Sequence, residues 1–362
     1  MESMGRIDGA FWKGKKVLVT GHTGFKGAWL SLWLQELGAQ VVGISNGVPT
    51  KPSLYRAVEW GDLHLNVESD IRDRVALSAI IAQTNPEIIF HLAAQSLVRP
   101  SYQDPVGTFS TNIMGTLNIF ECARSFSSVR AVINVTSDKC YENHEGDAPY
   151  RESDRLGGRD PYSCSKACSE LITTAYQRSF FIVESSTRKV GLASVRAGNV
   201  IGGGDWSADR LIPDCVRAFS KNESVLIRNP ESTRPWQHVL DAARGYLLTA
   251  QALFKDPVKH SEAYNFGPDV KDATSVSNLL GEITKRWGAG AAWSKDEKSG
   301  PHESVNLSLD SSYAREKLGW APLLSISQSL DLTVAWYKAF QTGGKMTSLS
   351  QSQIKHVASL ES

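Results

Sequence analysis

The sequence lacks any run of about 18 apolar residues, so nothing in its 362 residues predicts a membrane-spanning helix. It also lacks an excess of charge, because 39 Lys and Arg stand against 38 Asp and Glu, for a net charge of +1. This argues against a dedicated nucleic-acid binder and a polybasic membrane-surface protein. The first ten residues contain no apolar signal segment. We therefore expect a cytoplasmic protein.

Cysteine is scarce, and the five residues form no C-x-x-C pair. Their number is odd, and no histidine stands at zinc-ligand spacing from them, which disfavours both a disulfide framework and a zinc site. We therefore expect reduced, buried thiols and no metal. The cysteines are Cys122, Cys140, Cys164, Cys168 and Cys215.

Short apolar runs alternate with amphipathic segments through the first half of the chain. Six strands are predicted, at 17–19, 41–44, 63–65, 87–91, 129–135 and 191–195. Helices are predicted between them, at 28–37, 71–83, 105–124 and 161–180. This alternation predicts an α/β fold of the Rossmann type, a doubly wound parallel sheet that binds ligands at the carboxyl ends of its strands.

After about residue 195 the alternation weakens, and glycine, proline and tryptophan become frequent. We therefore divide the chain into a nucleotide-binding domain (1–195), a smaller substrate-binding region interleaved with it (196–342) and a polar tail (343–362). Within the second part, a strand is predicted at 263–266 and helices at 241–253, 276–287, 313–318 and 325–340. The polar tail is expected to fray.

Three glycines at G-x-x-G-x-x-G spacing follow the first predicted strand and open the first helix: Gly21, Gly24 and Gly27. Without Cβ atoms, such a loop turns tightly and lets the backbone approach a pyrophosphate, which the N–H groups of the following helix can bind. No G-K-[ST] ending follows, which disfavours a P-loop. This context predicts a dinucleotide site.

The second predicted strand is followed by Ile44-Ser45-Asn46-Gly47, with no acidic residue. An acid there would bind a ribose hydroxyl and select NAD over NADP, so the residues alone leave this choice open. His22 and Lys26 lie inside the glycine loop. They are expected either to add positive charge beside the phosphates or to be exposed to solvent.

Tyr162 and Lys166 stand four residues apart on the helix predicted to open at Pro161, so they share one helix face. A free tyrosine ionises near pH 10, and a neighbouring ammonium favours the phenolate. Such a pair could take a proton from a hydroxyl while a nicotinamide takes the hydride. Alone the spacing is common, but after a glycine loop it is more specific.

The strand at 129–135 ends in the polar stretch Thr136-Ser137-Asp138-Lys139. Polar residues at the carboxyl end of a parallel strand are placed for ligand work. Ser137 could hydrogen-bond the reacting hydroxyl beside Tyr162, and Asp138 and Lys139 add an acid and an amine. The alternative is a capped loop with an exposed ion pair.

These motifs resemble the extended short-chain dehydrogenase/reductases that act on nucleotide sugars, and the resemblance covers nearly the whole chain. It extends to His91-Leu92-Ala93-Ala94-Gln95, Asn112 and Arg196-Ala197-Gly198-Asn199-Val200. Within the family, Ser137-Asp138-Lys139 followed by Tyr141 is similar to the 4,6-dehydratases, with Lys139 where the enzymes for dTDP-glucose have glutamate. The 4-epimerases tend to have small, uncharged residues at positions 138 and 139.

The stretches 20–27, 49–55 and 232–239 are similar to the subgroup that acts on CDP-glucose. The resemblance therefore implies CDP-glucose as substrate and NAD as cofactor. It implies that Tyr162, with Lys166 and Ser137, removes the C4 hydroxyl proton. Lys139 would be the base at C5, and Asp138 the acid that protonates the leaving C6 hydroxyl.

The resemblance also assigns binding residues. Those implied for the cofactor are Gly21, His22, Thr23, Gly24, Phe25, Lys26, Gly27, Asp70, Ile71, Ala93, Ala94, Gln95, Asn112, Thr136, Tyr162 and Lys166. Those implied for the substrate are Asn199, Arg210, Arg234 and His302. Each of these four could instead have a surface or structural role. Asp70 could be a helix N-cap, and Asn112 could make only ordinary helix hydrogen bonds. Trp206 and Trp236 could stack on a base or pack in the core.

Two other functions stay open. The first is another nucleotide-sugar 4,6-dehydratase or a 4-epimerase. The second is a regulator that binds a dinucleotide without catalysis, although such regulators tend to lose the tyrosine or the lysine. The family further implies a homodimer or homotetramer, and a role in making deoxysugars for bacterial surface polysaccharide such as the O-antigen of lipopolysaccharide.

Overall fold

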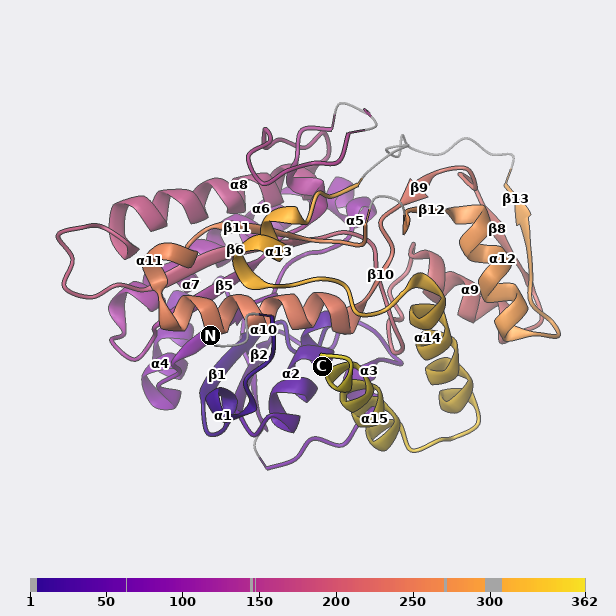
Figure 1. Ribbon diagram of the computed structural model, residues 1–362, viewed down its shortest axis with the longest axis horizontal. Coiled ribbons are helices and arrows are strands. Elements are labelled where there is room, and N and C mark those ends of the chain that lie inside the picture. The colour runs from indigo at the N-terminus through magenta and orange to yellow at the C-terminus, as the bar shows by residue number, and fades with distance from the viewer. Residues whose placement is uncertain are drawn as a thin grey trace.

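The chain is described by a computed structural model (Figure 1) that covers residues 5–62, 64–143, 146, 148–269, 272–296 and 308–361. A long parallel sheet crosses the molecule, and a set of shorter strands and helices lies at one end of it (Figure 1). None of the helices within these ranges is long and apolar enough to cross a membrane.

The central sheet of the described chain has seven strands, and all of them run parallel. Their spatial order is β3 (His64–Glu68), β2 (Gln40–Ser45), β1 (Lys16–Thr20), β4 (Ile88–His91), β5 (Ala131–Val135), β6 (Gly191–Ala197) and β11 (Ala263–Phe266). The order reverses direction between β1 and β4, which opens a crevice at their carboxyl ends. The predicted doubly wound fold is confirmed.

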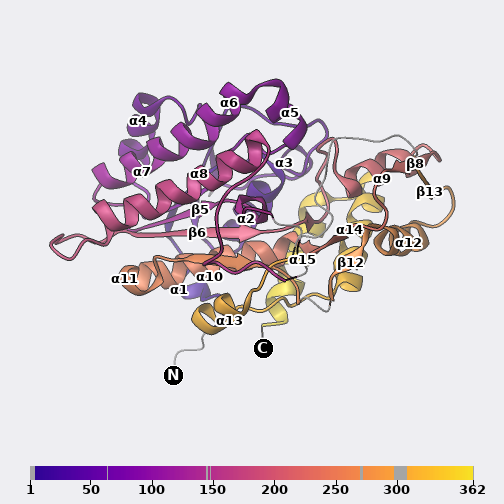
Figure 2. The same cartoon turned by 90° about the horizontal axis from the view of Figure 1, so that it is seen from above.

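Helices cover both faces of the sheet (Figure 2). One face packs against α4 (Arg74–Thr84), α7 (Gly115–Ser125) and α8 (Pro161–Tyr176), and the other against α1 (Gly9–Trp12), α2 (Phe25–Glu36) and α10 (Val239–Lys255). Strands β5 and β6 are buried along their whole length. Burial on both faces explains why these strands read as continuous apolar runs and not as alternating ones.

The remaining described elements are short connections and the region beyond β6. On the first half of the chain these are α3 (Leu54–Ala57), α5 (Val98–Gln103), α6 (Pro105–Phe109) and the turns η1 (Ser110–Met114), η2 (Asp138–Cys140) and η3 (Gln177–Phe181). Beyond β6 the helices are α9 (Leu211–Phe219), α11 (Pro257–His260), α12 (Val276–Trp287), α13 (Ser312–Leu318), α14 (Ile326–Gln341) and α15 (Met346–Ser359). The short strands there are β7 (Val200–Ile201), β8 (Ser224–Ile227), β9 (Thr233–Arg234), β10 (Gln237–His238), β12 (Thr274–Ser275) and β13 (Ala292–Lys295).

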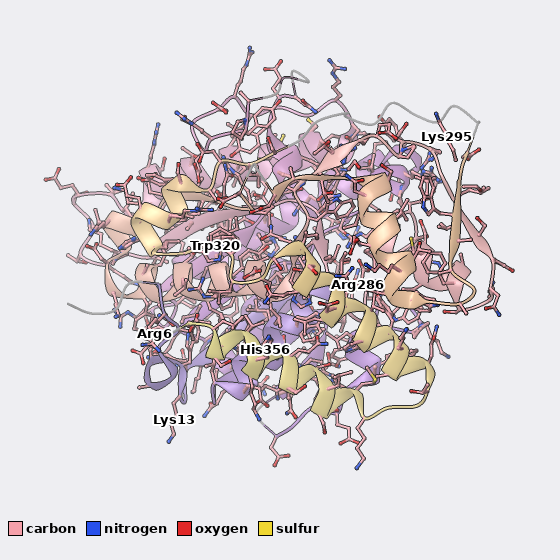
Figure 3. The ribbon with its side chains drawn as sticks, turned by 45° about the vertical axis from the view of Figure 1, so that its right-hand side comes forward. Arg6, Lys13, Arg286, Lys295, Trp320 and His356 are labelled. Carbon is pink, nitrogen blue, oxygen red and sulfur yellow. The ribbon has the colours of Figure 1, made fainter. Side chains whose placement is uncertain are left out.

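The region beyond β6 is tied to the first half of the chain by the glycine segment 202–204. The indole N–H of Trp29 on α2 donates to the carbonyl of Gly203 (2.9 Å), and the backbone N–H of Leu54 donates to the carbonyl of Gly204 (3.1 Å). Within the region, the guanidinium of Arg286 on α12 donates to Asp331 on α14 at 2.7 Å (Figure 3). These contacts hold the region over the carboxyl edge of the sheet.

Several predicted elements differ in detail. Strand β3 begins at His64, and the helix after it begins at Arg74, three residues later than predicted, because Asp73 is its N-cap. The predicted helix 105–124 contains the π-helical turn η1, and α8 passes into the π-helical turn η3. Cys164 and Cys168 are half-buried, and only the other three of the five free thiols are buried as expected.

The expectation that the C-terminal tail frays is wrong. Residues 346–359 form α15, which packs against α14 and α2. Its buried side chains include Met346, Ile354 and Val357, spaced so that they share one helix face. The many polar residues of the tail occupy the other faces, which is why the composition of the segment hid its apolar face.

Candidate active site

The glycine loop has the geometry that a bound pyrophosphate requires. Gly21 has φ +72°, and a Cβ there would lie 2.7 Å from the backbone nitrogen of Ala93; a Cβ on Gly27 would lie 2.2 Å from the carbonyl oxygen of Gly21. Gly24 is the N-cap of α2 and has no side chain to cap the first N–H groups. The start of α2 therefore presents free N–H donors and its positive dipole end to the crevice.

Neither role expected for His22 is found, since it is neither a cation beside the phosphates nor exposed to solvent. Its ring is fully buried, against the Cα of Gly43 and beside the rings of Tyr55 and His64. Burial lowers the pKa of His22, and its Nε2 lies 2.7 Å from Oδ1 of Asn66. The imidazole is therefore neutral, and it packs between the glycine loop and strands β2 and β3 instead of facing a phosphate.

The other polar side chains of the loop divide between structure and site. The hydroxyl of Thr23 donates to the carbonyl of Gly47 (2.7 Å), which fixes the loop to the end of β2. Phe25 packs beside Gly202. The Lys26 ammonium makes no hydrogen bond or ion pair with any residue that the structure describes, and burial, then the charge of Arg210, lower its pKa to about 8. Such a half-buried cation suits an anionic ligand.

The loop after β4 forms the opposite wall of the crevice. Asn112 clamps this loop: its Oδ1 accepts from the backbone N–H of Gln95 (2.8 Å) and its Nδ2 donates to the Gln95 carbonyl (2.9 Å). The same amide donates to Ser165 on α8 (2.8 Å). Asn112 thus fixes the predicted cofactor-facing segment of Ala93, Ala94 and Gln95, and its hydrogen bonds are more than ordinary helix contacts.

Asp70 and Ile71 lie after β3, at the other end of the crevice. The Asp70 carboxylate accepts from the guanidinium of Arg72, with an ion pair of 2.6 Å, and that hydrogen bond lowers the pKa of Asp70. Asp70 is therefore not the helix N-cap that the sequence left open. Ile71 is buried against Gly115 of α7.

The carboxyl end of β5 brings the three predicted reacting side chains together. The Ser137 hydroxyl donates to Oδ1 of Asp138 at 2.9 Å, and both residues are buried. Oδ2 of Asp138 has no hydrogen-bond partner among the described residues. Lys139 follows on the turn η2 with an exposed side chain. Of these side chains, Asp138 is thus shielded from solvent, and Lys139 is accessible to it.

Tyr162 and Lys166 face this strand end from the first turns of α8. The helix begins here because Asp160 caps it, accepting from the N–H of Ser163 (3.0 Å), and Pro161 occupies its first position. The Lys166 ammonium donates to the carbonyl of Val135 on β5 at 3.1 Å. The predicted pair is therefore anchored to the strand that carries Ser137.

The electrostatics of the pair differ from the expectation. Burial raises the pKa of Tyr162 to about 12; the hydrogen bond with the Ser137 hydroxyl and the charge of Arg210 oppose the rise. Burial also lowers the pKa of Lys166 to about 8. Arg210, which the sequence did not place beside Tyr162, is thus a cation that favours the phenolate in this structure.

A buried network behind the site was missed by the sequence prediction. Glu170, four residues after Lys166 on α8, pairs with the guanidinium of Arg196 on β6 at 2.7 Å. It also accepts from the hydroxyls of Thr136 and Ser194. The Thr136 hydroxyl is therefore committed to Glu170 and is not free for a cofactor. The signal that could have found Glu170 is the spacing Tyr-x-x-x-Lys-x-x-x-Glu, which places the glutamate one turn further along the same helix face.

The predicted substrate residues lie on the region beyond β6. Arg210 pairs with Asp205 (3.0 Å), and the charge of Arg234 acts on Asp138, which places both arginines near the strand ends. Asn199 follows β6, and its carbonyl accepts from the N–H of Gln237 (3.1 Å). His302 lies outside the described residues.

Both candidate stacking tryptophans have packing roles. Trp206 packs edge-on against Tyr337, with ring centroids 5.3 Å apart, and also contacts Phe340. Trp236 is a buried member of the main core.

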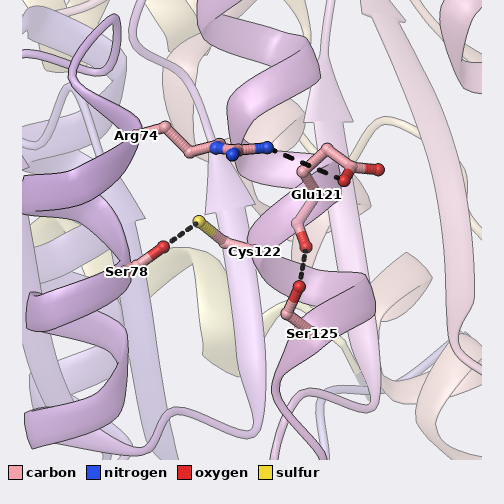
Figure 4. Close-up of a pocket in the computed structure, with 5 residues that line it drawn as sticks. All are labelled: Arg74, Ser78, Glu121, Cys122 and Ser125. Carbon is pink, nitrogen blue, oxygen red and sulfur yellow. Dashed lines mark hydrogen bonds and ion pairs between the residues drawn. The ribbon is translucent and has the colours of Figure 1, made fainter.

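A pocket on the helical layer is separate from this site. It lies between α4 and α7 and is lined by Arg74, Ser78, Glu121, Cys122 and Ser125 (Figure 4). Its polar groups are largely occupied by one another: Ser125 donates to the Glu121 carbonyl, and the Ser78 hydroxyl lies 3.5 Å from the Cys122 sulfur. Within the described ranges, no group of His, Cys, Asp and Glu residues could hold a metal ion.

Comparisons with known proteins agree with this geometry. A sequence model of the GDP-mannose 4,6-dehydratase family matches residues 18–333. The CDP-glucose 4,6-dehydratase of Salmonella typhimurium is 50% identical over 349 residues, which cover 96% of this chain and 97% of that protein.

Two solved structures share the fold. An epimerase from Methanothermobacter thermautotrophicus has a TM-score of 0.81 at 23% identity, covering 92% of this chain and 95% of that one. The dTDP-glucose 4,6-dehydratase of Bacillus anthracis, solved in complex with NAD, has a TM-score of 0.74 at 19% identity, covering 92% of this chain and all of that one. At these identities, both likenesses support the fold alone.

Proposed function

The chain belongs to the GDP-mannose 4,6-dehydratase family, and we propose that it is an NAD-dependent CDP-glucose 4,6-dehydratase, which converts CDP-glucose to CDP-4-keto-6-deoxyglucose and water. The observation that carries the proposal is the 50% identity to a protein of that name along nearly the whole of both chains. The gathering of Ser137, Asp138, Tyr162 and Lys166 at one strand end supports it, because this chemistry needs these groups together.

The residues present fit a dinucleotide. The contacts that a Cβ would make at Gly21 and Gly27 leave a cradle of backbone at the start of α2, where the pyrophosphate would be held. Lys26 offers its charge beside it, and the clamped segment 93–95 would border the nicotinamide side. When bound there, NAD supplies hydride acceptance from C4 of the sugar and hydride return to C6.

Oxidation at C4 requires that a hydroxyl proton leave the sugar. Tyr162 is the proposed acceptor, with the Ser137 hydroxyl as its hydrogen-bond partner and Lys166 fixed beside it by the Val135 carbonyl. The resulting 4-ketone acidifies the neighbouring C5–H, which is otherwise far too weak an acid to lose its proton. Oxidation at C4 must therefore precede the elimination, because it makes the C5 proton acidic enough to be removed.

The elimination needs a base at C5 and an acid at C6. We assign the base to Lys139, whose side chain is accessible, and the acid to Asp138. Burial raises the pKa of Asp138, with the charge of Lys139 and the hydrogen bond from Ser137 opposing the rise, so the carboxyl group is suited to hold a proton and release it to a leaving hydroxyl.

We assign the nucleotide diphosphate of the substrate to Arg210 and Arg234, whose charges reach Tyr162 and Asp138 respectively. Arginine binds phosphate oxygens through two parallel hydrogen bonds. Asn199 would contact the substrate at the end of β6. The cytidine base itself is assigned only from the relative's name.

Product analysis with CDP-, dTDP-, GDP- and UDP-glucose, each with NAD, tests the proposal. A 4-keto-6-deoxy product from CDP-glucose, formed faster than from the other three, supports it. No keto product from CDP-glucose would remove it. C4 inversion without loss of water would favour the second candidate, a 4-epimerase.

Matched variants test the base assigned to the elimination. Lys139→Ala should abolish exchange of the C5 proton with solvent, whereas Lys13→Ala, an exposed lysine of the first turn, should not change it. Exchange at C5 that survives in Lys139→Ala would show that another group is the base.

We further propose a cytoplasmic homodimer or homotetramer that supplies deoxysugars for surface polysaccharide such as O-antigen. This setting rests on the family resemblance and on the substrate proposed above. Light scattering of the purified protein tests its oligomeric state, and loss of O-antigen in a deletion strain tests its role. A monomer would contradict the proposed oligomeric state, and an unchanged lipopolysaccharide would contradict the proposed role in O-antigen synthesis.

A further inference from the structure

A short loop beyond β6, residues 205–210, carries one of the two arginines that we assign to the diphosphate of the substrate. Arg210 is the residue directly before α9, and its Nη1 pairs with the carboxylate of Asp205 at 3.0 Å. No hydrogen bond or ion pair with a described residue engages Nε or Nη2 of this guanidinium. Both nitrogens are therefore left to donate to phosphate oxygens.

The other end of this loop is tied to α5 by an ion pair. Nη1 of Arg99 on α5 lies 2.6 Å from Oδ1 of Asp209, although 110 positions separate the two residues in the chain. Helix α5 follows the cofactor-facing segment 93–95 and lies at the end of its helical layer nearest to the region beyond β6 (Figure 1, Figure 2). The ion pair therefore joins the two sides of the crevice directly beside Arg210.

Helix α5 is fixed in turn to the helix that carries Tyr162. The fully buried hydroxyl of Ser101 accepts from the backbone N–H of Tyr162 at 3.2 Å and donates to the carbonyl of Val98 at 2.6 Å. One buried hydroxyl thus joins the first turn of α8 to α5. Through Arg99, the same short helix gives the loop 205–210 a fixed frame relative to the reacting end of the site.

The backbone of Asp209 has a conformation that needs support. Its φ is +59°, in the left-handed region that residues other than glycine seldom adopt. The other described non-glycine residues with positive φ, Asn85 and Asn222, lie at or just beyond the ends of α4 and α9, where this conformation commonly ends a helix. Asp209 instead precedes α9. Such a conformation persists where contacts around it hold it, and the carboxylate of Asp209 is held by Arg99.

The neighbouring charges leave Arg99 to Asp209. The other acid on which the charge of Arg99 acts is Asp214, in the first turn of α9. Asp214 forms its own ion pair with Arg217, one turn further along that helix. The partner of Arg99 is therefore the residue next to Arg210 and not the acid on the helix behind it.

We propose that Arg99 and Asp209 are positioning residues, which hold Arg210 in place before the nucleotide sugar arrives, so that binding of the diphosphate does not have to order the loop. The proposal rests on the proposed function and extends it to two residues that contact no substrate and act through Arg210. Without the ion pair, part of the binding energy of the diphosphate would be used to order the loop 205–210. Once the substrate is bound, the reacting groups would stand as before.

The kinetics of Asp209→Asn test the proposal. Asparagine keeps the size of the side chain and tolerates a positive φ, so this variant removes the charge without straining the backbone. The two side chains of the pair are 44% and 43% exposed, so the variant does not open the core. We expect KM for CDP-glucose to rise about three- to fivefold, the upper range for an exposed ion pair, with kcat and NAD affinity unchanged.

Two further variants serve as rescue and control. Arg99→Lys keeps the positive charge and should keep most of the wild-type KM. Glu87→Gln breaks a partly exposed ion pair with Lys15 at the opposite, amino edge of the sheet, and it should change neither KM nor kcat. An unchanged KM in Asp209→Asn, or a fall in its kcat at unchanged KM, would overturn the proposal.

A double-mutant cycle separates positioning from direct contact. If Arg99 acts only through Asp209, then Arg99→Ala and the double variant Arg99→Ala/Asp209→Asn should have the same KM as Asp209→Asn alone. Effects of the two substitutions that multiply would show that Arg99 itself binds the substrate, and would also overturn the proposal.

The failure of this inference and the failure of the proposed function are distinguishable. The ratio of variant to wild-type KM can be measured with whichever of CDP-, dTDP-, GDP- or UDP-glucose the wild type converts, because all four carry the same diphosphate. Conversion of another sugar but not of CDP-glucose would remove the proposed function, and the ratio would still decide this inference. A keto product from CDP-glucose with an unchanged ratio would remove this inference alone.

Discussion

Glu170 of α8 and Arg196 of β6 form an ion pair in which both side chains are almost fully buried, with 2% and 3% exposure. The guanidinium donates from Nη2 at 2.7 Å and from Nε at 2.9 Å, a two-point contact across the boundary between a helix and the sheet. Another nitrogen of Arg196 donates to the Tyr141 hydroxyl (2.7 Å). The pair thus locks α8, which carries Tyr162 and Lys166, to the strands.

Removal of one partner of this pair should be costly. Glu170→Ala leaves a guanidinium buried without its carboxylate, so we expect a loss of about 3–5 kcal/mol in the free energy of unfolding. Urea unfolding followed by circular dichroism measures it. The control is Glu282→Ala, an exposed partner of Arg286, for which we expect a much smaller loss. Equal losses in the two variants would contradict the structural role given to the buried pair.

Gly27→Ala should disable the dinucleotide cradle. The new Cβ would lie 2.2 Å from the Gly21 carbonyl oxygen, a backbone atom that cannot move aside cheaply. We expect NAD binding, measured by calorimetry, to weaken at least about tenfold, or 1.4 kcal/mol. Gly281→Ala on α12 is the matched control, since nothing lies within 4 Å of a Cβ there, and it should leave binding unchanged. Unchanged NAD affinity in Gly27→Ala would place the cofactor elsewhere.

The buried charge of Lys26 predicts a pH-dependent stability. Its pKa is lowered to about 8 from 10.5, so between these values the folded chain has released a proton that the unfolded chain still binds. Stability should therefore rise with pH across this window, and the cost of the half-buried charge is fully present below pH 8.

Lys26→Met removes that cost and makes the prediction measurable. The variant should be more stable than the wild type at pH 7, and its advantage should shrink towards pH 10 in urea titrations. Lys16→Met, at an exposed position on β1, should show no such trend. An advantage of Lys26→Met that is independent of pH would mean that the gain comes from packing and not from charge.

The packing of α15 can be tested with one side chain. Ile354 is 2% exposed in the main core, so Ile354→Ala should cost about 2–5 kcal/mol in unfolding free energy. His356→Ala, two residues on at an exposed position of the same helix, should cost less than about 0.5 kcal/mol. Calorimetric unfolding compares them, and equal stabilities would show that α15 is not part of the cooperative unit.

Most of the sheet was predictable because strands such as β1, β4 and β5 are short apolar runs followed by a turn signal; β3, which carries His64, Asn66 and Glu68, was located only in part. The helix 276–287 was located to the residue, since Ser275 caps it and Gly288 ends it. The prediction for the C-terminal tail was wrong because the apolar face of α15 consists of a few residues among many polar ones, which no apolar run reveals. Local composition cannot show a packing partner that lies on α2, more than 300 residues earlier.

The candidate site was predictable where residue spacing fixes geometry, as for the glycine loop and for Tyr162 and Lys166. It was not predictable where burial decides the charge. His22 and Lys26 were both expected to be cations beside the phosphates or exposed side chains. Only Lys26 lies among the charged groups of the site, and the His22 ring is buried beneath the loop. Similarly, no spacing in the chain reveals that Arg196 meets Glu170, since the packing of α8 on the sheet brings them together.

The placement of α10 has a consequence for synthesis of the chain. This helix covers one face of strands β5 and β6, yet it follows β6 by about 40 residues in the chain. At a translation rate of about 5–20 residues per second, that apolar face stays bare for several seconds while the intervening segment is made. The nascent sheet is therefore a substrate for chaperones during this interval, and slowing the ribosome between codons 198 and 255 should lower the yield of folded protein more than slowing it afterwards.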